Sequence, residues 1–312
     1  MSAPLVSILV PVFNGEPFLA ECLDSILAQD LGDYEVLISD DVSMDGSAAV
    51  IQRYARRNSR IRWWRNPRNL GIGGNFNACL TAARGEYLKF VLQDDKLLDP
   101  SALRRMVEVM ESDASVSLVG SAFHLIDAQS RLLQVCNRFR RSGVQDGKRV
   151  IIYCLEQNGN SIGGPSLVLF RKSQSARGFD EQLVQLLDLE MWFHLLEQGR
   201  FAYIAEPLSA FRQHPAQLTE VNRRSGDSAN EGLLLVEKYY SRLWMKEAAT
   251  PRMLFTQMYH LRKRPDERAA ALRAEIARKL SWRTYAIWWV WHKLTQPFCN
   301  FKRWLEKRRI VR

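Results

Sequence analysis

The stretch YEVLISDDVSMDG, residues 34–46, places two adjacent carboxylates directly after a short apolar run. A second stretch, YLKFVLQDD at residues 87–95, repeats this arrangement with Asp94 and Asp95. Short apolar runs bounded by polar turn residues predict buried β-strands. Because ligands of open α/β sheets bind outside the carboxyl ends of the strands, the two acidic clusters predict a binding site at that edge.

The chemistry of the two clusters indicates what such a site would bind. Neighbouring carboxylates repel each other unless a cation or the donors of a ligand satisfy them. Sites built only from oxygen ligands suit hard cations such as Mg²⁺ or Mn²⁺. The pattern therefore favours a metal-bound substrate that contains phosphate. The alternative is that these acids are ordinary turn and helix-cap residues.

The first hundred residues alternate between strand and helix patterns. Strands are expected at residues 5–12, 35–39, 60–64 and 87–92, and helices at residues 16–29, 47–57, 75–83 and 101–111. In the first of these helices, Leu19, Cys22, Leu23, Ile26 and Leu27 fall on one face. This order predicts an α/β fold with a doubly wound, mainly parallel sheet and right-handed crossovers.

The rest of the chain is expected to be mixed and then helical. Further strands are expected at residues 116–120, 166–170 and 201–204, a hairpin at 123–135, and helices at 146–156 and 187–198. From about Ser225 the pattern is helical, with interruptions at Pro251, Pro265 and Pro297. We therefore expect a main domain of residues 1–224 and a helical C-terminal extension of residues 225–312.

Composition narrows the class of protein. Of the 312 residues, 46% are hydrophobic and 25% are charged, which is typical of a globular chain. Neither a secretory leader nor an apolar stretch long enough to span a bilayer is visible. The five scattered cysteines form no CxxC or Cys/His metal pattern, which favours a reducing cytoplasm.

The net charge of +10 is concentrated at the C-terminal end. Residues 281–312 contain eight Lys or Arg, one acid and five of the nine tryptophans. The nearly neutral remainder argues against a nucleic-acid partner. Tryptophan interleaved with basic residues is typical of a segment that lies on an anionic membrane surface. A helical cap packed on the main domain and a nucleic-acid patch are the alternatives.

The ordered motifs of the chain resemble those of the family 2 glycosyltransferases, which have the GT-A fold. These motifs are VSILVPVFN at residues 6–14, DDVSMDG at 40–46, NLG at 69–71, RGEY at 84–87 and QDD at 93–95. The resemblance runs from about Leu5 to Leu218, and its specificity lies in the order of the motifs. It implies inverting transfer of a sugar from a nucleotide diphosphate sugar.

The resemblance implies a nucleotide-sugar site built from the first motifs. Pro11, Phe13 and Asn14 match the loop that lines the base pocket, and Asn69 and Gly71 belong to a further motif of the same site.

Asp40 matches the carboxylate that accepts the imide hydrogen of uracil or thymine. A carboxylate suits this task because it only accepts hydrogen bonds, whereas the pyrimidine imide donates one. Donors linked to UDP or dTDP are therefore expected; a helix-entry cap is the alternative role for Asp40. Asp41 and Asp45 are interpreted as cap and turn residues, since Asp45 begins an Asp-Gly turn.

Asp94 and Asp95 match the end of the metal-binding acidic motif of the family. The metal, Mg²⁺ or Mn²⁺, bridges the two phosphates and neutralises the charge on the departing diphosphate. The commonest motif is Asp-x-Asp-Asp, and here Leu92 stands in place of the first acid. Asp95 is expected to bind the metal directly, and Asp94 to bind the ribose or to support the ligands.

The acceptor side is represented by Asp188, which matches the catalytic base. An inverting transfer needs a base within hydrogen-bond reach of the acceptor hydroxyl, although a carboxylate at a helix N-terminus is also what the helix dipole favours. Glu190 is expected to face solvent. Arg212 and His214 match a segment that closes over the site, where both would contact the diphosphate and His214 would also serve the metal. The loop of residues 163–166 matches a loop near the acceptor.

The favoured interpretation is a non-processive glycosyltransferase that builds a cell-surface polysaccharide or glycolipid at the inner face of the cytoplasmic membrane. Processive synthases usually carry a Gln-x-x-Arg-Trp motif and several membrane spans, and neither is seen. One alternative is a polyprenyl-phosphate sugar synthase. Another is a catalytically inactive, membrane-associated assembly protein, which the missing acid at Leu92 leaves open.

Overall fold

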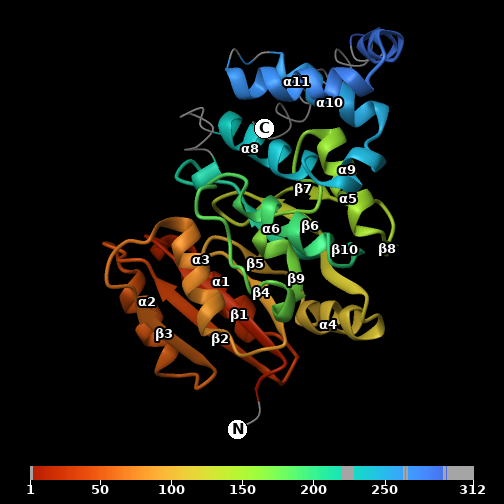
Figure 1. The fold of residues 1–312 in the computed structure, drawn as a ribbon. Coiled ribbons are helices and arrows are strands. Elements are labelled where there is room, and N and C mark those ends of the chain that lie inside the picture. The colour runs from red at the N-terminus through yellow and green to blue at the C-terminus, as the bar shows by residue number, and fades with distance from the viewer. Residues whose placement is uncertain (1–2, 220–227, 263, 265, 291–292, 294–312) are drawn as a thin grey trace. The chain divides into compact units, whose positions relative to one another are not determined.

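The computed structural model describes residues 3–219, 228–262, 264, 266–290 and 293 (Figure 1). The chain separates into two compact units, one of residues 1–150 and 162–231 and the other of residues 151–161 and 232–312. The first unit contains a mixed α/β fold, and the described part of the second is helical.

One sheet runs through the first unit in the order β3-β2-β1-β4-β9-β6-β10-β5, with β7 paired to β6 and β8 to β10. Neighbouring strands among β3, β2, β1 and β4 are parallel, whereas β9 is antiparallel to both β4 and β6. The strands are β1 (Val6–Val12), β2 (Tyr34–Asp40), β3 (Ile61–Arg65), β4 (Tyr87–Phe90), β5 (Lys96–Leu97), β6 (Val116–Ile126), β7 (Leu132–Cys136), β8 (Gly143–Gln145), β9 (Val168–Arg171) and β10 (Arg200–Arg212).

Helices cover both faces of this sheet (Figure 1). The apolar side chains of α1 (Glu16–Leu27), α2 (Ser47–Ala55) and α4 (Ala102–Ser112) join those of β1 and β2 in one buried core. Alternate strand residues point to the other face, which is covered by α3 (Gly71–Ala82) and α6 (Leu187–Leu196). There the rings of Phe76, Phe90, Phe170 and Trp192 pack in series, with centroids 4.6 to 6.3 Å apart. The doubly wound fold predicted from the sequence is confirmed.

The second half of the sheet departs from the expected strand limits. β10 was expected only over residues 201–204, yet it continues to Arg212 because register shifts around Pro207 accommodate a residue that has no N–H to donate. The expected hairpin is confirmed as β6 paired antiparallel with β7. The strand expected from Ser166 begins with a 3₁₀ turn, η1 (Pro165–Leu167), and a second turn, η2 (Lys172–Gln174), follows β9.

The remaining helices are α5 (Gly147–Gln157), α8 (Ser228–Tyr240), α9 (Leu243–Ala248), α10 (Pro251–Leu261) and α11 (Glu267–Lys279). Pro251 does not interrupt a helix but begins α10, where Thr250 Oγ1 accepts a hydrogen bond from Met253 N at 3.1 Å. Pro265 and Pro297 lie outside the described residues. Across the described part of the chain, no helix combines the length and apolar character needed to cross a membrane.

Candidate active site

Loops that follow β1, β2 and β4 are joined by hydrogen bonds at one edge of the sheet. Gln93 Oε1 accepts from Phe13 N at 2.8 Å, and Gln93 Nε2 donates to Phe13 O at 2.9 Å. Asn14 N donates to Ser43 Oγ at 2.9 Å, and Asn14 Oδ1 accepts from Met44 N at 2.8 Å. The first motif therefore lies against both acidic clusters. Sequence reasoning missed Gln93, because only the sheet brings it to Phe13.

The first motif exposes one ring beside these loops. Phe13 leaves 48% of its surface exposed, whereas Pro11 is buried within β1 opposite Ser39 of β2. An exposed aromatic ring offers a face on which a planar base can stack. Pro11 by contrast contributes through the backbone of the strand end.

Asp40, the last residue of β2, is fully buried. Its Oδ1 accepts a hydrogen bond from Ser43 N at 3.0 Å. Its Oδ2 has no hydrogen-bond partner among the described residues and lies 3.4 Å from the Arg65 guanidinium. Asp40 Oδ2 therefore remains available to accept a hydrogen bond from a further donor.

Asp41 supports the next loop. Its Oδ1 accepts from Leu70 N at 2.8 Å and its Oδ2 from Gly71 N at 3.0 Å, at the start of α3. Asn69 Nδ2 donates to Asp41 O at 3.1 Å, and Gly71 has a φ of 73°, which favours glycine. Asp45 likewise accepts from backbone N–H groups at the starts of α1 and α2. The cap and turn roles predicted for Asp41 and Asp45 are confirmed.

The second cluster, Asp94 and Asp95, contacts Arg212 and His214 at the end of β10. Asp95 is 1% exposed, and its Oδ1 accepts from Arg212 N at 2.9 Å. Its Oδ2 is buried without a hydrogen-bond partner in the described part of the chain. Burial and the neighbouring Asp94 carboxylate raise the pKa of Asp95 well above its usual value. Asp94 Oδ2 lies 3.1 Å from His214 Nε2.

Arg212 does not point its guanidinium at an open ligand site. The side chain is 1% exposed, and its Nε donates to Asp94 O at 2.7 Å. One terminal nitrogen donates to Asp127 O and Ser130 Oγ at 3.1 and 2.8 Å, and the other to Glu21 Oε2 at 2.6 Å. The sequence placed Arg212 against a diphosphate; its guanidinium contacts protein instead, because the longer β10 carries this residue into the interior.

Asp188 lies half-buried in the first turn of α6, as its motif predicted. The segment before this helix is fixed by Glu231, which sequence reasoning missed. Its carboxylate accepts three consecutive backbone N–H groups at 2.8 to 2.9 Å, those of Val184, Gln185 and Leu186. Bonds of this kind hold the helix start, and hence Asp188, in place.

The loop of residues 163–166 connects Asp188 to the acid pair. A Cβ atom built on Gly164 would lie 4.0 Å from Asp188 Oδ2. Ser166 Oγ accepts from Leu92 N at 2.9 Å, just ahead of Gln93 and the two acids. The predicted acceptor loop therefore contacts both the strand end of the acid pair and the helix of the predicted base.

Two buried charges flank this region. Glu190 was expected to face solvent, but it is fully buried and forms a 2.6 Å ion pair with Arg177, because α6 packs nearly all its residues inside the fold. Lys89 of β4 is also fully buried and donates to Ser166 O. Burial lowers the pKa of Lys89 to about 7. A lysine within the apolar run of residues 87–92 was the sequence signal for it.

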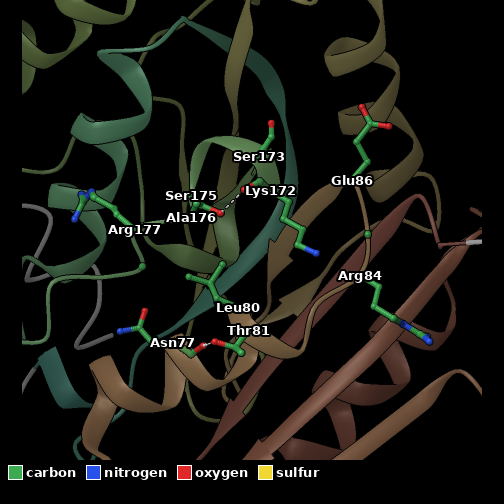
Figure 2. Close-up of a pocket in the computed structure, with 12 residues that line it drawn as sticks. Asn77, Leu80, Thr81, Arg84, Glu86, Lys172, Ser173, Ser175, Ala176 and Arg177 are labelled. Atoms are coloured by element: carbon green, nitrogen blue, oxygen red, sulfur yellow. Dashed lines mark hydrogen bonds between the residues drawn. The ribbon is translucent and has the colours of Figure 1, made fainter.

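A hollow of about 630 Å³ lies at the opposite end of β4 (Figure 2). None of the predicted site residues lines it. Its cations have protein partners: Arg84 pairs with Glu35, Lys172 donates to Ala83 O and Arg177 pairs with Glu190. Figure 2 shows Arg84 and Arg177 directed to opposite sides of the hollow. The candidate site is therefore the edge with the acidic clusters.

Comparison with known proteins identifies the family of this chain. The family model for glycosyl transferase family 2 matches residues 7–173. An uncharacterized protein of Mycobacterium tuberculosis is 33% identical over 229 residues, which are 70% of each chain. The chondroitin synthase of Escherichia coli is 28% identical over 203 residues, which are 64% of this chain but only 28% of that protein.

Solved structures share the fold at low identity. TarS of S. aureus, residues 1–349 in complex with UDP-GlcNAc, has a TM-score of 0.60 at 17% identity and covers 87% of this chain, with 84% of its own chain matched. The mannosyltransferase PcManGT of Pyrobaculum calidifontis, in complex with GDP-Man and Mn²⁺, has a TM-score of 0.61 at 19% identity over 99% of this chain and 86% of its own. Because the family model spans more than half of the chain, and the sheet carries both acidic motifs of the family along one edge, this chain belongs to glycosyl transferase family 2 and is a glycosyltransferase of GT-A fold.

Proposed function

We propose that this enzyme is an inverting glycosyltransferase that moves a sugar from a UDP- or dTDP-linked donor to a polysaccharide or lipid-linked glycan. The observation that carries the proposal is the linked arrangement of Asp40, the pair Asp94–Asp95 and Asp188 along one edge of the sheet. The similarity to a chondroitin synthase supports a polysaccharide product. A polyprenyl-phosphate acceptor is the alternative.

The donor preference follows from the one free oxygen of Asp40. A pyrimidine imide presents a single N–H, which one carboxylate oxygen satisfies. Guanine presents two kinds of donor on the same edge, and Asp40 Oδ1 is already bonded to Ser43 N. The exposed ring of Phe13 would stack on the base. These contacts favour UDP or dTDP over GDP.

The acid pair fits a divalent cation. Asp95 Oδ2 is a buried carboxylate oxygen without a partner in the described structure, and a hard cation satisfies such an oxygen. Within the described residues, no three or more His, Cys, Asp or Glu side chains form a complete metal site, so phosphate oxygens and water would supply the other ligands. Asp95 and His214 would hold Mg²⁺ or Mn²⁺, with Asp94 orienting His214. The bound cation neutralises charge on the diphosphate.

Asp188 would accept the proton of the acceptor hydroxyl. Its place at the start of α6 favours the ionised carboxylate through the helix dipole. Glu231 and the loop of residues 163–166 hold it while the acceptor binds. General-base catalysis requires this fixed position, since the carboxylate must reach the hydroxyl as the glycosidic bond forms.

A nucleotide screen tests the proposed function. Thermal unfolding is followed with UDP, dTDP or GDP, each with Mn²⁺ and with EDTA. At about a hundred times its dissociation constant, UDP or dTDP with Mn²⁺ should stabilise the protein by about 2.7 kcal/mol. GDP should stabilise it least. If GDP alone stabilised the protein, the proposed role of Asp40 in binding a pyrimidine would be contradicted. If no nucleotide stabilised it, an inactive assembly protein would be favoured.

Asp95→Asn should stabilise the unliganded protein and at the same time weaken ligand binding. Because the folded pKa of Asp95 is raised, its ionisation costs stability at every pH above its unfolded pKa of about 3.9. The variant should therefore be more stable than the wild type at pH 7.5, and this gain should shrink towards pH 5. Urea unfolding at the two pH values measures it.

The same variant should lose the stabilisation that UDP with Mn²⁺ gives. Asp127→Asn serves as the control, because Asp127 is another acid near Arg212 whose side chain, among the described residues, bonds only to its own turn. A stable Asp95→Asn protein that still responds to UDP with Mn²⁺ would remove the metal role of Asp95.

Asp188→Asn keeps the shape of the side chain but removes the base. Turnover should fall by at least about 10²-fold, the lower range for general-base catalysis. The dissociation constant for nucleotide with Mn²⁺, measured by calorimetry, should stay unchanged, because Asp188 serves the acceptor. If the variant lost nucleotide binding but kept normal turnover at saturating donor, Asp188 would belong to the donor site and not to the acceptor site.

We also propose that the C-terminal end rests on anionic lipid at the inner face of the cytoplasmic membrane. Residues 282–290 are helical, and Trp282, Ile287 and Trp289 are 75%, 68% and 44% exposed. Arg283 and Lys293 lie over the rings of Trp282 and Trp289, the combination that suits a lipid headgroup region. Trp291, Trp304 and most of the basic residues of 281–312 lie outside the described structure.

Liposome co-sedimentation tests the lipid proposal. The double variant W282S/W289S should bind anionic vesicles less than the wild type, and added salt should weaken both because the charges are exposed. Leu243→Ser removes an equally exposed apolar side chain from α9 and is the control. Equal sedimentation of all three proteins would leave the helix of residues 282–290 without a role at the membrane.

A further inference from the structure

We propose that Glu21 is a positioning residue of the donor site, acting through Arg212 on the acid pair and His214. The inference rests on the proposed donor site and adds to it a residue that no motif marks. Glu21 lies on α1, outside all of the sequence motifs. Its role follows from the contacts that converge on its carboxylate.

The carboxylate of Glu21 collects three donors from separate parts of the sheet. Ser130 Oγ, from the turn between β6 and β7, lies 2.7 and 2.8 Å from its two oxygens. Lys96 Nζ donates from β5, and an Arg212 nitrogen donates from the end of β10 at 2.6 Å. Burial acts to raise the pKa of Glu21, but the bonds from Lys96 and Ser130 outweigh it and hold that pKa below its usual value.

Arg212 depends on this carboxylate. Its guanidinium is buried, and Glu21 is the one carboxylate within ion-pair distance of it in the described structure. A buried cation that loses its counter-charge is strongly disfavoured and turns towards another acceptor or towards water. Helix α1 also supplies Phe18, whose ring lies 4.8 Å from the guanidinium and 4.8 Å from the ring of His214.

The position of Arg212 in turn sets the proposed ligands. Its Nε holds the carbonyl of Asp94, and its backbone N–H holds Asp95 Oδ1. His214 follows two residues later and contacts Asp94. A shift of the guanidinium would therefore release the Asp94 carbonyl and disturb the segment that carries both acids and the contact of Asp94 with His214. Residues that orient metal ligands in this way typically change metal affinity about 10- to 100-fold when they are replaced.

Glu35 offers a matched control at the opposite end of the sheet. It lies near the start of β2, accepts from Ser7 Oγ at 2.7 Å and pairs with Arg84 at 2.7 Å. Glu21 and Glu35 thus each bind one serine hydroxyl and two basic side chains, Lys96 and Arg212 for Glu21 and Arg62 and Arg84 for Glu35, and local bonds lower the pKa of both. Only Glu21 is connected to the acid pair.

The experiment compares Glu21→Gln and Glu35→Gln with the wild type in the full chain. Calorimetry gives the dissociation constant of UDP with Mn²⁺, and electron paramagnetic resonance gives that of Mn²⁺ alone. We expect both constants to rise about tenfold or more in Glu21→Gln and less than about twofold in Glu35→Gln, although Glu35 is the more buried carboxylate and its variant should lose more unfolding stability. Glu21→Asp should recover part of the affinity.

A milder pair keeps the test decisive if Glu21→Gln does not fold. Ser130→Ala removes one hydroxyl shared by Glu21 and Arg212, and Ser7→Ala removes the hydroxyl bound to Glu35. Ser130→Ala alone should weaken UDP–Mn²⁺ binding. If Glu21→Gln weakened binding no more than Glu35→Gln, and Ser130→Ala no more than Ser7→Ala, while the wild type bound UDP and Mn²⁺ normally, the role of Glu21 alone would be overturned. A wild type that binds neither UDP nor Mn²⁺ would overturn the donor site and this inference with it.

Discussion

Parallel pairing of β1 with β2 and β4 is the constraint on which the donor site depends. The register aligns Val12 with Asp40, and β4 lies on the other side of β1. Parallel strands end at the same edge, so loops that are far apart in the chain emerge together. Gln93, Asn14 and Ser43 then join these loops through their side chains. Without that register, neither acidic cluster would have neighbours.

The electrostatics of this edge favour ligand binding at some cost to stability. Asp40 and Asp95 are buried carboxylates that each retain an oxygen without a hydrogen bond in the described structure. Asp95 destabilises the unliganded fold, because its desolvation is only partly offset, whereas Asp40 also has the Arg65 guanidinium 3.4 Å from its Oδ2. Functional sites characteristically carry this burden. The opposite end of the sheet differs, since the buried Glu35 there is fully engaged with serine and arginine partners.

Several features of the site were predictable and several were not. The alternation of apolar runs and turns predicted the strands that carry Asp40 and the acid pair, because short-range pattern alone decides where a strand ends. The burial of Glu190 and Arg212 was not predictable. Glu190 is held by Arg177, thirteen residues away in sequence, and Arg212 by Glu21 on the first helix. From sequence alone, a charged residue is predicted to be exposed whenever its ion-pair partner is distant in the chain.

By itself, the amino-acid sequence determined the family, the order of the elements and the identity of the acids at the strand ends, because these depend only on the local residue pattern and on the spacing of the motifs. Only the tertiary structure decided which of those groups remain free to bind a ligand. Asp41 has both oxygens bonded to the start of α3, whereas Asp40 and Asp95 keep one oxygen each. That difference depends on which backbone N–H groups lie within reach, and long-range packing sets those distances.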